Sequence, residues 1–232
     1  YAKGAKLLKM LHDHLGEKDF KEGLKHYFNT YAYQNTVGED LWNSFTLISG
    51  VEVADLMNSW LEKPGLPCVT VEQTSRDLTL SQQRLLLDET DEKSAWTIPL
   101  DDGGELSLLN TREQKVTLNK PDWIMLNSNG SGHFVTKYEN NEHKNWLSEQ
   151  LVDSKVNSTW KIARLNDIIM LAKSGQGSLT EALDSVNGAS SETRAVVWSQ
   201  IAAVIGAAKK LTEGDKATKT SIKEWAYTLV EE

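Results

Sequence analysis

The sequence contains a single cysteine and four prolines among its 232 residues. Because Cys68 has no second cysteine to pair with, an internal disulfide is excluded, and a cytoplasmic protein is the simplest interpretation. The longest run of small and apolar residues, 201–208, is too short to span a bilayer. The first ten residues, YAKGAKLLKM, also lack the layout of a signal peptide. We therefore expect no association with a membrane.

The sequence also lacks an excess of basic residues. Its 33 acidic residues outnumber 25 lysines and arginines, and the formal net charge is −8. A nucleic-acid-binding protein needs a clustered basic surface, so we expect no nucleic-acid partner. The lysines near the C-terminus are interspersed with acids on a helical segment, and we interpret them as a solvated face: Lys209, Lys210, Lys216, Lys219 and Lys223.

No familiar catalytic or metal-binding motif occurs in the sequence. The His-Glu-x-x-His pattern of zinc peptidases and the Gly-x-Ser-x-Gly pattern of serine hydrolases are both missing. The histidines of the run His12-Asp13-His14 would point about 200° apart on a helix, so they cannot bind one ion. The other histidines have no metal-ligand spacing to Cys68 or to each other. We interpret all of them as ordinary polar residues.

What the sequence does contain, at its N-terminal end, is helical periodicity. Leu8, Leu11 and Leu15 recur at helical spacing, and Gly16 ends this first helix. A second helix is expected over about 17–30, with one apolar side made of Phe20, Leu24, Tyr27 and Phe28.

Two further helices are expected before residue 64. Thr36 and Glu39 have the spacing of a capping box, in which the two side chains satisfy free N–H groups at a helix start. The next helix ends before Pro64 and Gly65, since proline supplies no N–H and glycine turns freely.

From Cys68 onward the periodicity changes to short alternating or apolar runs separated by polar turns. Seven strands are expected, at 69–71, 78–80, 85–87, 96–100, 116–118, 124–126 and 134–138. This number and spacing favour a β-sandwich. Helical spacing returns near Glu142 and continues as hairpins that are typical of the beginning of an α-solenoid.

Several stretches, in order, resemble the aminopeptidase N family of thermolysin-like zinc aminopeptidases (gluzincins). Residues 1–5 resemble its Tyr-x-Lys-Gly-Ala motif, and the segment YAYQNTVGEDLW shares the family's Tyr33, Asn35, Asp40, Leu41 and Trp42. The next landmarks are Met57, Trp60, Pro64, Gly65, Pro67 and Val71. Later landmarks are Trp96 to Leu100, Asp122-Trp123, Gly132, Tyr138 and Arg164-Leu165-Asn166-Asp167.

The resemblance has gaps. His133, Phe134, Val135 and Thr136 stand where the family has Tyr-Tyr-Arg-Val, and the helices after residue 205 match weakly. The resemblance implies an α+β, multi-domain fold in three parts. These are the helical C-terminal end of a thermolysin-like catalytic domain (1–66), a β-sandwich (67–140) and the start of an α-helical, solenoid-like domain (141–232).

For function, the resemblance implies a metalloprotease that removes N-terminal residues from peptides. In the family, zinc polarises the scissile carbonyl and activates a water, and the glutamate of the motif is the general base. These residues are absent from the sequence, so we expect the parent enzyme to hold the zinc and this fragment to bind none and to be inactive alone. Tyr1 matches the family's tyrosine that donates a hydrogen bond to the oxyanion, and it is the one catalytic residue expected here.

Two hypotheses stay open. The chain is either a fragment of a zinc aminopeptidase acting on peptides, or a non-catalytic binding or scaffold module built from a β-sandwich and helical hairpins. For the fragment, the cut removes the partners of the first helices, so Leu8, Leu11 and Leu15 are expected to lose part of their cover. An exposed apolar patch of that kind predicts self-association through the N-terminal helices.

Overall fold

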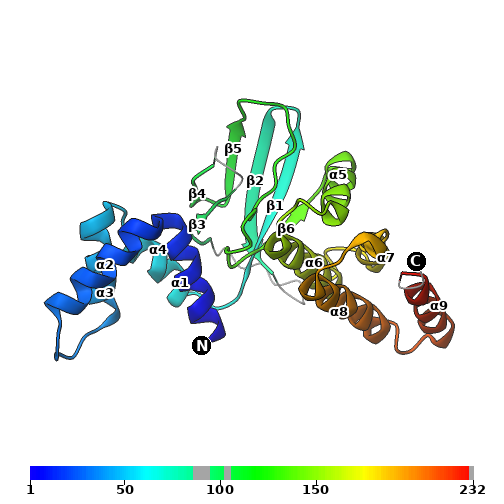
Figure 1. Cartoon of the computed structure of the whole chain (residues 1–232). Coiled ribbons are helices and arrows are strands. Elements are labelled where there is room, and N and C mark those ends of the chain that lie inside the picture. Colours follow the sequence, from blue (N-terminus) through cyan, green and yellow to red (C-terminus); the bar gives the residue numbers. More distant parts are fainter. Residues whose placement is uncertain (86–94, 102–105, 230–232) are drawn as a thin grey trace.

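The computed structural model describes residues 1–85, 95–101 and 106–229. The structure mixes helices with a small amount of sheet, and the sheet stands between two groups of helices (Figure 1). Helices α1 to α4 precede the sheet in sequence, and α5 to α9 follow it. No helix within the described ranges is long and apolar enough to cross a membrane. The division into domains at residues 66 and 140 stays a prediction.

The first helical group has the bounds α1 (Ala2–Leu15), α2 (Glu17–Thr30), α3 (Gly38–Ser49) and α4 (Val53–Leu61). Gly16 separates α1 from α2 with a φ of 80°, which glycine adopts without steric cost, and its N–H donates to the carbonyl of His12. The buried face of α1 differs from the expected stripe. The expectation that Leu11 loses part of its cover is wrong, because Leu11 is fully buried together with Leu7. Leu8 is 40% exposed and Leu15 is partly buried.

The expected capping box at the start of α3 is wrong. The N–H of Val37 donates to Oδ2 of Asp40 at 2.8 Å, so the carboxylate that caps this helix belongs to Asp40 and not to Glu39. The hydroxyl of Thr36 is instead bonded to the hydroxyl of Tyr27 at 2.7 Å. The helix begins later than expected because Thr36 is engaged with the neighbouring helix.

A four-stranded sheet and a two-stranded sheet follow, with bounds β1 (Pro67–Thr74), β2 (Asp77–Arg84), β3 (Ile98–Pro99), β4 (Leu108–Leu109), β5 (Glu113–Thr117) and β6 (Val135–Tyr138). The larger sheet has the order β5-β2-β1-β6, and β3 pairs with β4. Strands β1 and β2 form an antiparallel hairpin, whereas β1 and β6 are parallel, with Cys68 opposite Val135.

Strand β1 is covered on both faces. Val69 and Val71 lie in the main hydrophobic core, while Cys68 packs with Val135 and Leu171 on the other side. Strand β5 is the opposite case, because it forms an edge of the sheet and exposes Glu113 and Lys115. Charged residues on an edge strand hinder pairing with a further chain.

Two of the expected strands differ in the structure. Residues 124–126 are not a strand, because side chains take the place of a neighbouring strand. The N–H of Ile124 donates to Oε1 of Gln73 at 3.1 Å, and the N–H of Leu126 donates to the Tyr138 hydroxyl at 3.0 Å. Of the run 85–87, Leu85 follows the end of β2 and the other two residues lie outside the described ranges. Strand β4, which has two residues, was not expected.

The second helical group comprises α5 (Asn141–Val152), α6 (Ser158–Lys173), α7 (Leu179–Asp184), a 3-10 turn (Ala189–Ser191), α8 (Ala195–Leu211) and α9 (Lys216–Thr228). Four of these helices begin with a side-chain cap, from Asn140, Asn157, Ser178 and Asp215. Helix α6 contacts β6, α7 and α8, and half of its residues are buried. It is therefore the helix that joins the sheet to the rest of this group.

A buried ion pair connects α6 to the segment before α8. Nζ of Lys161, which is fully buried, lies 3.0 Å from Oε2 of Glu192, and Nη2 of Arg194 lies 2.6 Å from the same oxygen. The hydrogen bonds from Arg194 hold the pKa of the Glu192 carboxyl well below its usual range. Glu192 is thus ionised at neutral pH and compensates the charge of Lys161.

We predict that Glu192→Ala lowers the free energy of unfolding by about 3–5 kcal/mol, because it leaves the ammonium of Lys161 buried without a counter-charge. Urea denaturation at pH 7 measures this loss. Glu181→Ala is the matched control, since Glu181 pairs with Lys144 at 3.7 Å and is partly exposed; it should cost no more than about 1 kcal/mol. Equal losses in the two variants would contradict the prediction.

Candidate functional site

Tyr1, the expected catalytic residue, lies at the N-terminal end of α1. Its carbonyl accepts the N–H of Ala5 at 2.9 Å, which is the first hydrogen bond of the helix. Its side chain is fully exposed. A tyrosine hydroxyl at this place is free to donate a hydrogen bond to a ligand.

A hollow of about 330 Å³ lies beside α1, lined by residues of α1, of the segment 127–135, of α6 and of α8. Its polar lining is formed by Lys6, Asn127, His133, Thr159, Asn166, Asp167 and Gln200. Nζ of Lys6 donates to the carbonyl of Gly130, and burial lowers the pKa of the Lys6 ammonium. Burial also lowers the pKa of His133, and the charges of Lys3 and Lys6 act in the same direction. The hollow thus combines a cation with a histidine that favours the neutral form.

The lining of this hollow includes a buried carboxylate, Asp167. Oδ2 of Asp167 accepts the N–H of Thr136 at 2.9 Å and the Thr136 hydroxyl at 2.5 Å. Nη1 of Arg164 donates to the carbonyl of Thr136 at 3.1 Å, and its guanidinium lies 5.0 Å from the centre of the Tyr138 ring. Burial raises the pKa of Asp167 to about 6, although these hydrogen bonds and the nearby Arg164 favour its charged form.

His143 lies in an aromatic cluster next to this carboxylate network. Its ring stacks on Trp123 at 4.7 Å and meets the edge of Tyr138 at 4.6 Å, and Nε2 lies 2.8 Å from the carbonyl oxygen of Ile124. Burial lowers the pKa of His143 to about 4, and burial likewise raises the pKa of Tyr138 to about 12. Both groups are therefore neutral at physiological pH and serve as packing residues.

Within the part of the chain that the structure describes, the residues do not fit a zinc site. Among the described residues, no group of three or more histidines, cysteines, aspartates and glutamates could hold a metal ion. The ring nitrogens of His12 lie 2.8 Å from Asp13 and from Glu17, so this histidine is engaged in ion pairs. Cys68 is fully buried, and burial raises the pKa of its thiol to about 12.

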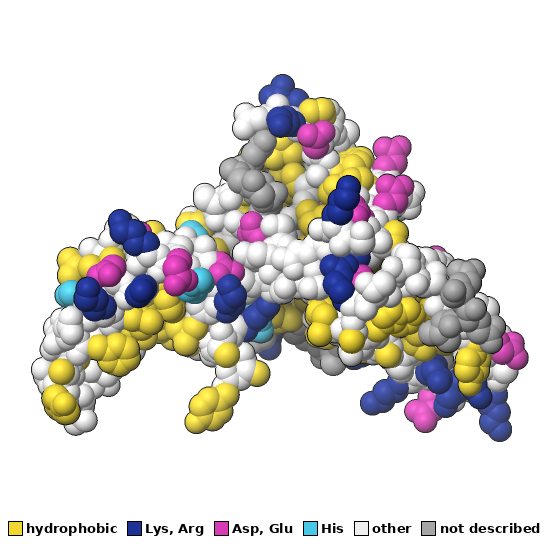
Figure 2. Space-filling view, in the orientation of Figure 1, with side chains coloured by type: hydrophobic (Ala, Val, Ile, Leu, Met, Phe, Trp, Pro, Cys, Tyr) yellow, Lys and Arg dark blue, Asp and Glu magenta, His cyan; other side chains and the backbone are white. Residues whose placement is uncertain are grey.

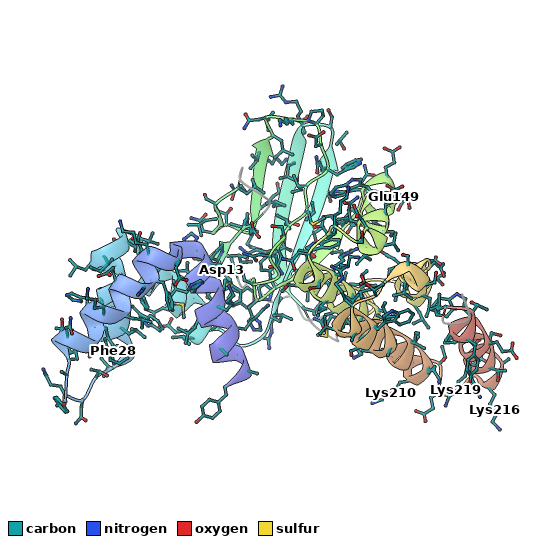
Figure 3. All side chains as sticks on the ribbon, viewed as in Figure 1. Asp13, Phe28, Glu149, Lys210, Lys216 and Lys219 are labelled. Carbon is teal, nitrogen blue, oxygen red and sulfur yellow. The ribbon has the colours of Figure 1, made fainter. Side chains whose placement is uncertain are left out.

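The C-terminal lysines gather at the corner between α8 and α9. Lys210, Lys216 and Lys219 point outward there, and the same corner carries the largest group of dark blue side chains on the face seen in Figure 2 (Figures 2 and 3). All three are exposed. Ammonium groups in water are screened and fully hydrated, so this cluster agrees with a solvated face.

Comparison with known proteins identifies the family. Residues 1–60 match the Peptidase family M1 domain, and residues 123–232 match the ERAP1-like C-terminal domain. Aminopeptidase N of Lactococcus lactis subsp. cremoris (strain MG1363) is 31% identical over 96% of the chain, and the match covers 27% of that protein. Tricorn protease-interacting factor F2 of Thermoplasma volcanium is 31% identical over 87% of the chain and 25% of its own length.

A third relative, aminopeptidase 2 of Candida albicans, is 30% identical over 100% of the chain and 26% of its own length. Together with the mixed helical and sheet structure, these matches place the chain in peptidase family M1, the family of aminopeptidase N. The resemblance seen in the sequence is thereby confirmed. The chain spans about a quarter of the length of these relatives.

Several residues around the site were not expected from the sequence. No contact was expected for Lys6, Asp13 or Asn129, yet they connect α1 to the segment 127–132. Their contacts join residues more than 100 positions apart, so no local spacing could indicate them. Asp167 was named only as part of a family motif, and its buried contact with Thr136 was not expected.

We predict that the titration of Asp167 lowers the free energy of unfolding as the pH rises from about 4 to about 7. The folded pKa of about 6 lies above the ordinary value of 3.8, so the folded protein binds the proton of Asp167 more tightly than the unfolded chain does. The stabilisation from this proton is therefore fully present below pH 4 and is lost as the pH rises through 6. The loss amounts to about 3 kcal/mol. The lowered folded pKa of His143 has the opposite effect and raises the free energy of unfolding with pH over this range. The prediction therefore concerns the difference in stability between the wild type and Asp167→Asn, in which the effect of His143 cancels.

The measurement is urea denaturation of the wild type and of Asp167→Asn at several pH values. The variant should gain stability relative to the wild type as the pH rises. Asp184→Asn, at an exposed carboxylate on α7, is the control and should follow the wild type. A difference between Asp167→Asn and the wild type that does not change with pH contradicts the prediction.

Proposed function

We propose that the chain forms part of a zinc metallo-aminopeptidase that removes N-terminal residues from peptides. The observation that carries the proposal is Tyr1, which begins a Tyr-x-Lys-Gly-Ala motif inside the segment matched by the Peptidase family M1 domain. Its exposed side chain stands at the start of α1, the helix that lines the hollow beside Lys6. Aminopeptidase relatives support the same reaction class.

The role proposed for Tyr1 is to donate a hydrogen bond from its hydroxyl to the oxyanion of the tetrahedral intermediate. A donor fixed at that place stabilises charge that develops only in the transition state. Its proton stays on the phenol oxygen throughout, because a hydrogen-bond donor does not need to transfer it.

The zinc-binding motif of this family does not occur in the sequence. His-Glu-x-x-His is absent from the 232 residues, and the described residues contain no metal-binding group. We therefore assign the zinc ligands to residues outside this sequence and propose that the chain is inactive alone. The matching architecture is a helical end of a thermolysin-like domain (1–66), a β-sandwich (67–140) and the start of a helical domain (141–232). A cytoplasmic location remains a prediction from the single cysteine.

The alternative is a binding or scaffold module without catalysis. It rests on the missing His-Glu-x-x-His pattern, and within the described ranges no group of residues could hold a metal ion. The two hypotheses differ in their prediction for Tyr1. In a binding or scaffold module, substituting Tyr1 would change the rate of no reaction.

The test is a chimera in which this chain replaces the matching quarter of the Lactococcus lactis aminopeptidase N. We expect the chimera to hydrolyse an aminoacyl chromogenic substrate, and Tyr1→Phe to lower its kcat about 100-fold to 1000-fold, as loss of an oxyanion donor does. Because the interaction forms only in the transition state, KM should change little.

Tyr227→Phe is the control, since Tyr227 lies on α9 and is about half exposed. The isolated chain should show no turnover and no stoichiometric zinc after dialysis. An active, well-folded chimera that keeps its kcat with Tyr1→Phe would show that Tyr1 is not catalytic.

The exposed apolar residues of the N-terminal helices predict that copies of the isolated chain associate with each other. Phe28, Leu47 and Leu61 are each more than half exposed, and Phe28 lies at the outer end of α2 (Figure 3). Exposed apolar side chains on neighbouring helices favour association in water. We predict that Phe28→Ser shifts the isolated chain toward the monomer in sedimentation velocity, whereas Tyr227→Ser on α9 does not.

A further inference from the structure

The loop 127–132 touches α1 at two points. Nζ of Lys6 donates to the carbonyl of Gly130, and Nδ2 of Asn129 donates to Oδ2 of Asp13 at 3.1 Å. Lys6 and Asp13 are seven residues apart, which places them on one face of the helix, two turns from each other. Two contacts spaced along one face fix the direction of the helix as well as its position.

The loop itself is held rigidly. Asn127 adopts a φ of 57°, and its Oδ1 accepts the N–H of Gly132 at 2.7 Å. Oδ1 of Asn129 accepts both the N–H and the hydroxyl of Ser131, at 2.9 and 2.7 Å. Oδ2 of Asp101 accepts the N–H of Asn129 at 2.9 Å. A backbone held by this many hydrogen bonds does not follow a displaced helix, so it can serve as a fixed support.

The same loop packs against the second helical group. Gly130 has a φ of 70°, and a Cβ at this position would lie 2.8 Å from the carbonyl oxygen of Thr159 at the start of α6. This contact is with backbone, which cannot move aside as a flexible side chain does. The loop therefore touches both α1 and α6 and spans the junction between the two helical groups.

We propose that the loop 127–132 sets the position of α1, and with it Tyr1, relative to α6 and α8, with Asp13 and Asn129 as the positioning residues. Tyr1 precedes Lys6 by five residues, about 7.5 Å along the helix axis, so a tilt of α1 moves its hydroxyl directly. The consequence for catalysis rests on the proposed function of Tyr1, whereas the positioning of α1 does not.

Asp13 has contacts within α1 and contacts across to the loop 127–132, and only the second kind can position the helix. Lys9 and His12, both on α1, also contact Asp13, but contacts within one helix do not orient it against the rest of the protein. Across to the loop, Asp13 accepts the hydrogen bond from Asn129 and also interacts with the Ser131 side chain, which Asn129 itself holds.

The experiment uses three variants of the full chain. Asn129→Asp places two carboxylates opposite each other and removes the amide donor. Asp13→Asn combined with Asn129→Asp reverses donor and acceptor and restores the hydrogen bond, while the carboxylate at 129 still accepts from Ser131. Asn145→Asp is the matched control, because it makes the same chemical change at an exposed position on α5.

Two readouts follow the position of α1. The first is the distance between spin labels at Ala5→Cys on α1 and Ser199→Cys on α8, both exposed positions; the native Cys68 is buried and remains unlabelled. The second is amide exchange in α1. For Asn129→Asp we expect a shifted and broader distance distribution and exchange about tenfold or more faster, the factor for losing one charged hydrogen bond. The double variant should recover wild-type values, and Asn145→Asp should keep them.

Unchanged distances in Asn129→Asp would overturn the proposal, and so would a double variant that does not recover, because general disruption would then explain the effect. In the active chimera, Asn129→Asp should lower kcat with KM unchanged, and the double variant should restore it. If the distance changes are present but the active chimera keeps its kcat with Tyr1→Phe, the role of Tyr1 is rejected and the positioning of α1 remains supported. An active chimera whose distances do not respond would reject the positioning alone.

Discussion

The hydrogen bonds between the carboxylate of Asp167 and Thr136 are the contact on which the arrangement of sheet and helices depends. They attach α6 to the last strand of the sheet, at a point where both residues are almost fully buried. Arg164, one turn earlier on α6, binds the carbonyl of the same threonine. Both polar groups of the Thr136 backbone are thus satisfied by α6, and the edge of the sheet is closed by a helix instead of a further strand.

Local spacing was sufficient to predict most of the helices, because a buried stripe repeats every three or four residues regardless of its partner. It failed where a distant side chain decided the outcome. Residues 124–126 have the apolar pattern of a strand, but the hydroxyl of Tyr138 and the amide of Gln73 occupy their N–H groups. Asp40 capped α3 in place of Glu39 because Thr36 had a partner on α2.

The candidate site was predictable only in part, for the same physical reason. Tyr1 was proposed from a motif of consecutive residues, which a sequence displays directly, and its role stays a prediction. Asp13 and Asn129 carry no such signal, since their contact forms only after two segments 116 residues apart have been brought together. A polar residue of this kind looks like surface in the sequence, and only the folded chain reveals which surface positions face each other.

The parallel pairing of β1 with β6 has a consequence for the order in which the protein is made. Val69 cannot find its partner Thr136 until the ribosome has synthesised almost 70 further residues, so one side of β1 stays unpaired in the meantime. Non-local pairing of this kind is slow, and an open strand edge invites association with other chains during that interval. The hairpin with β2 can form early, but a nascent chain acquires a closed sheet only when Tyr138 and then α6 have emerged.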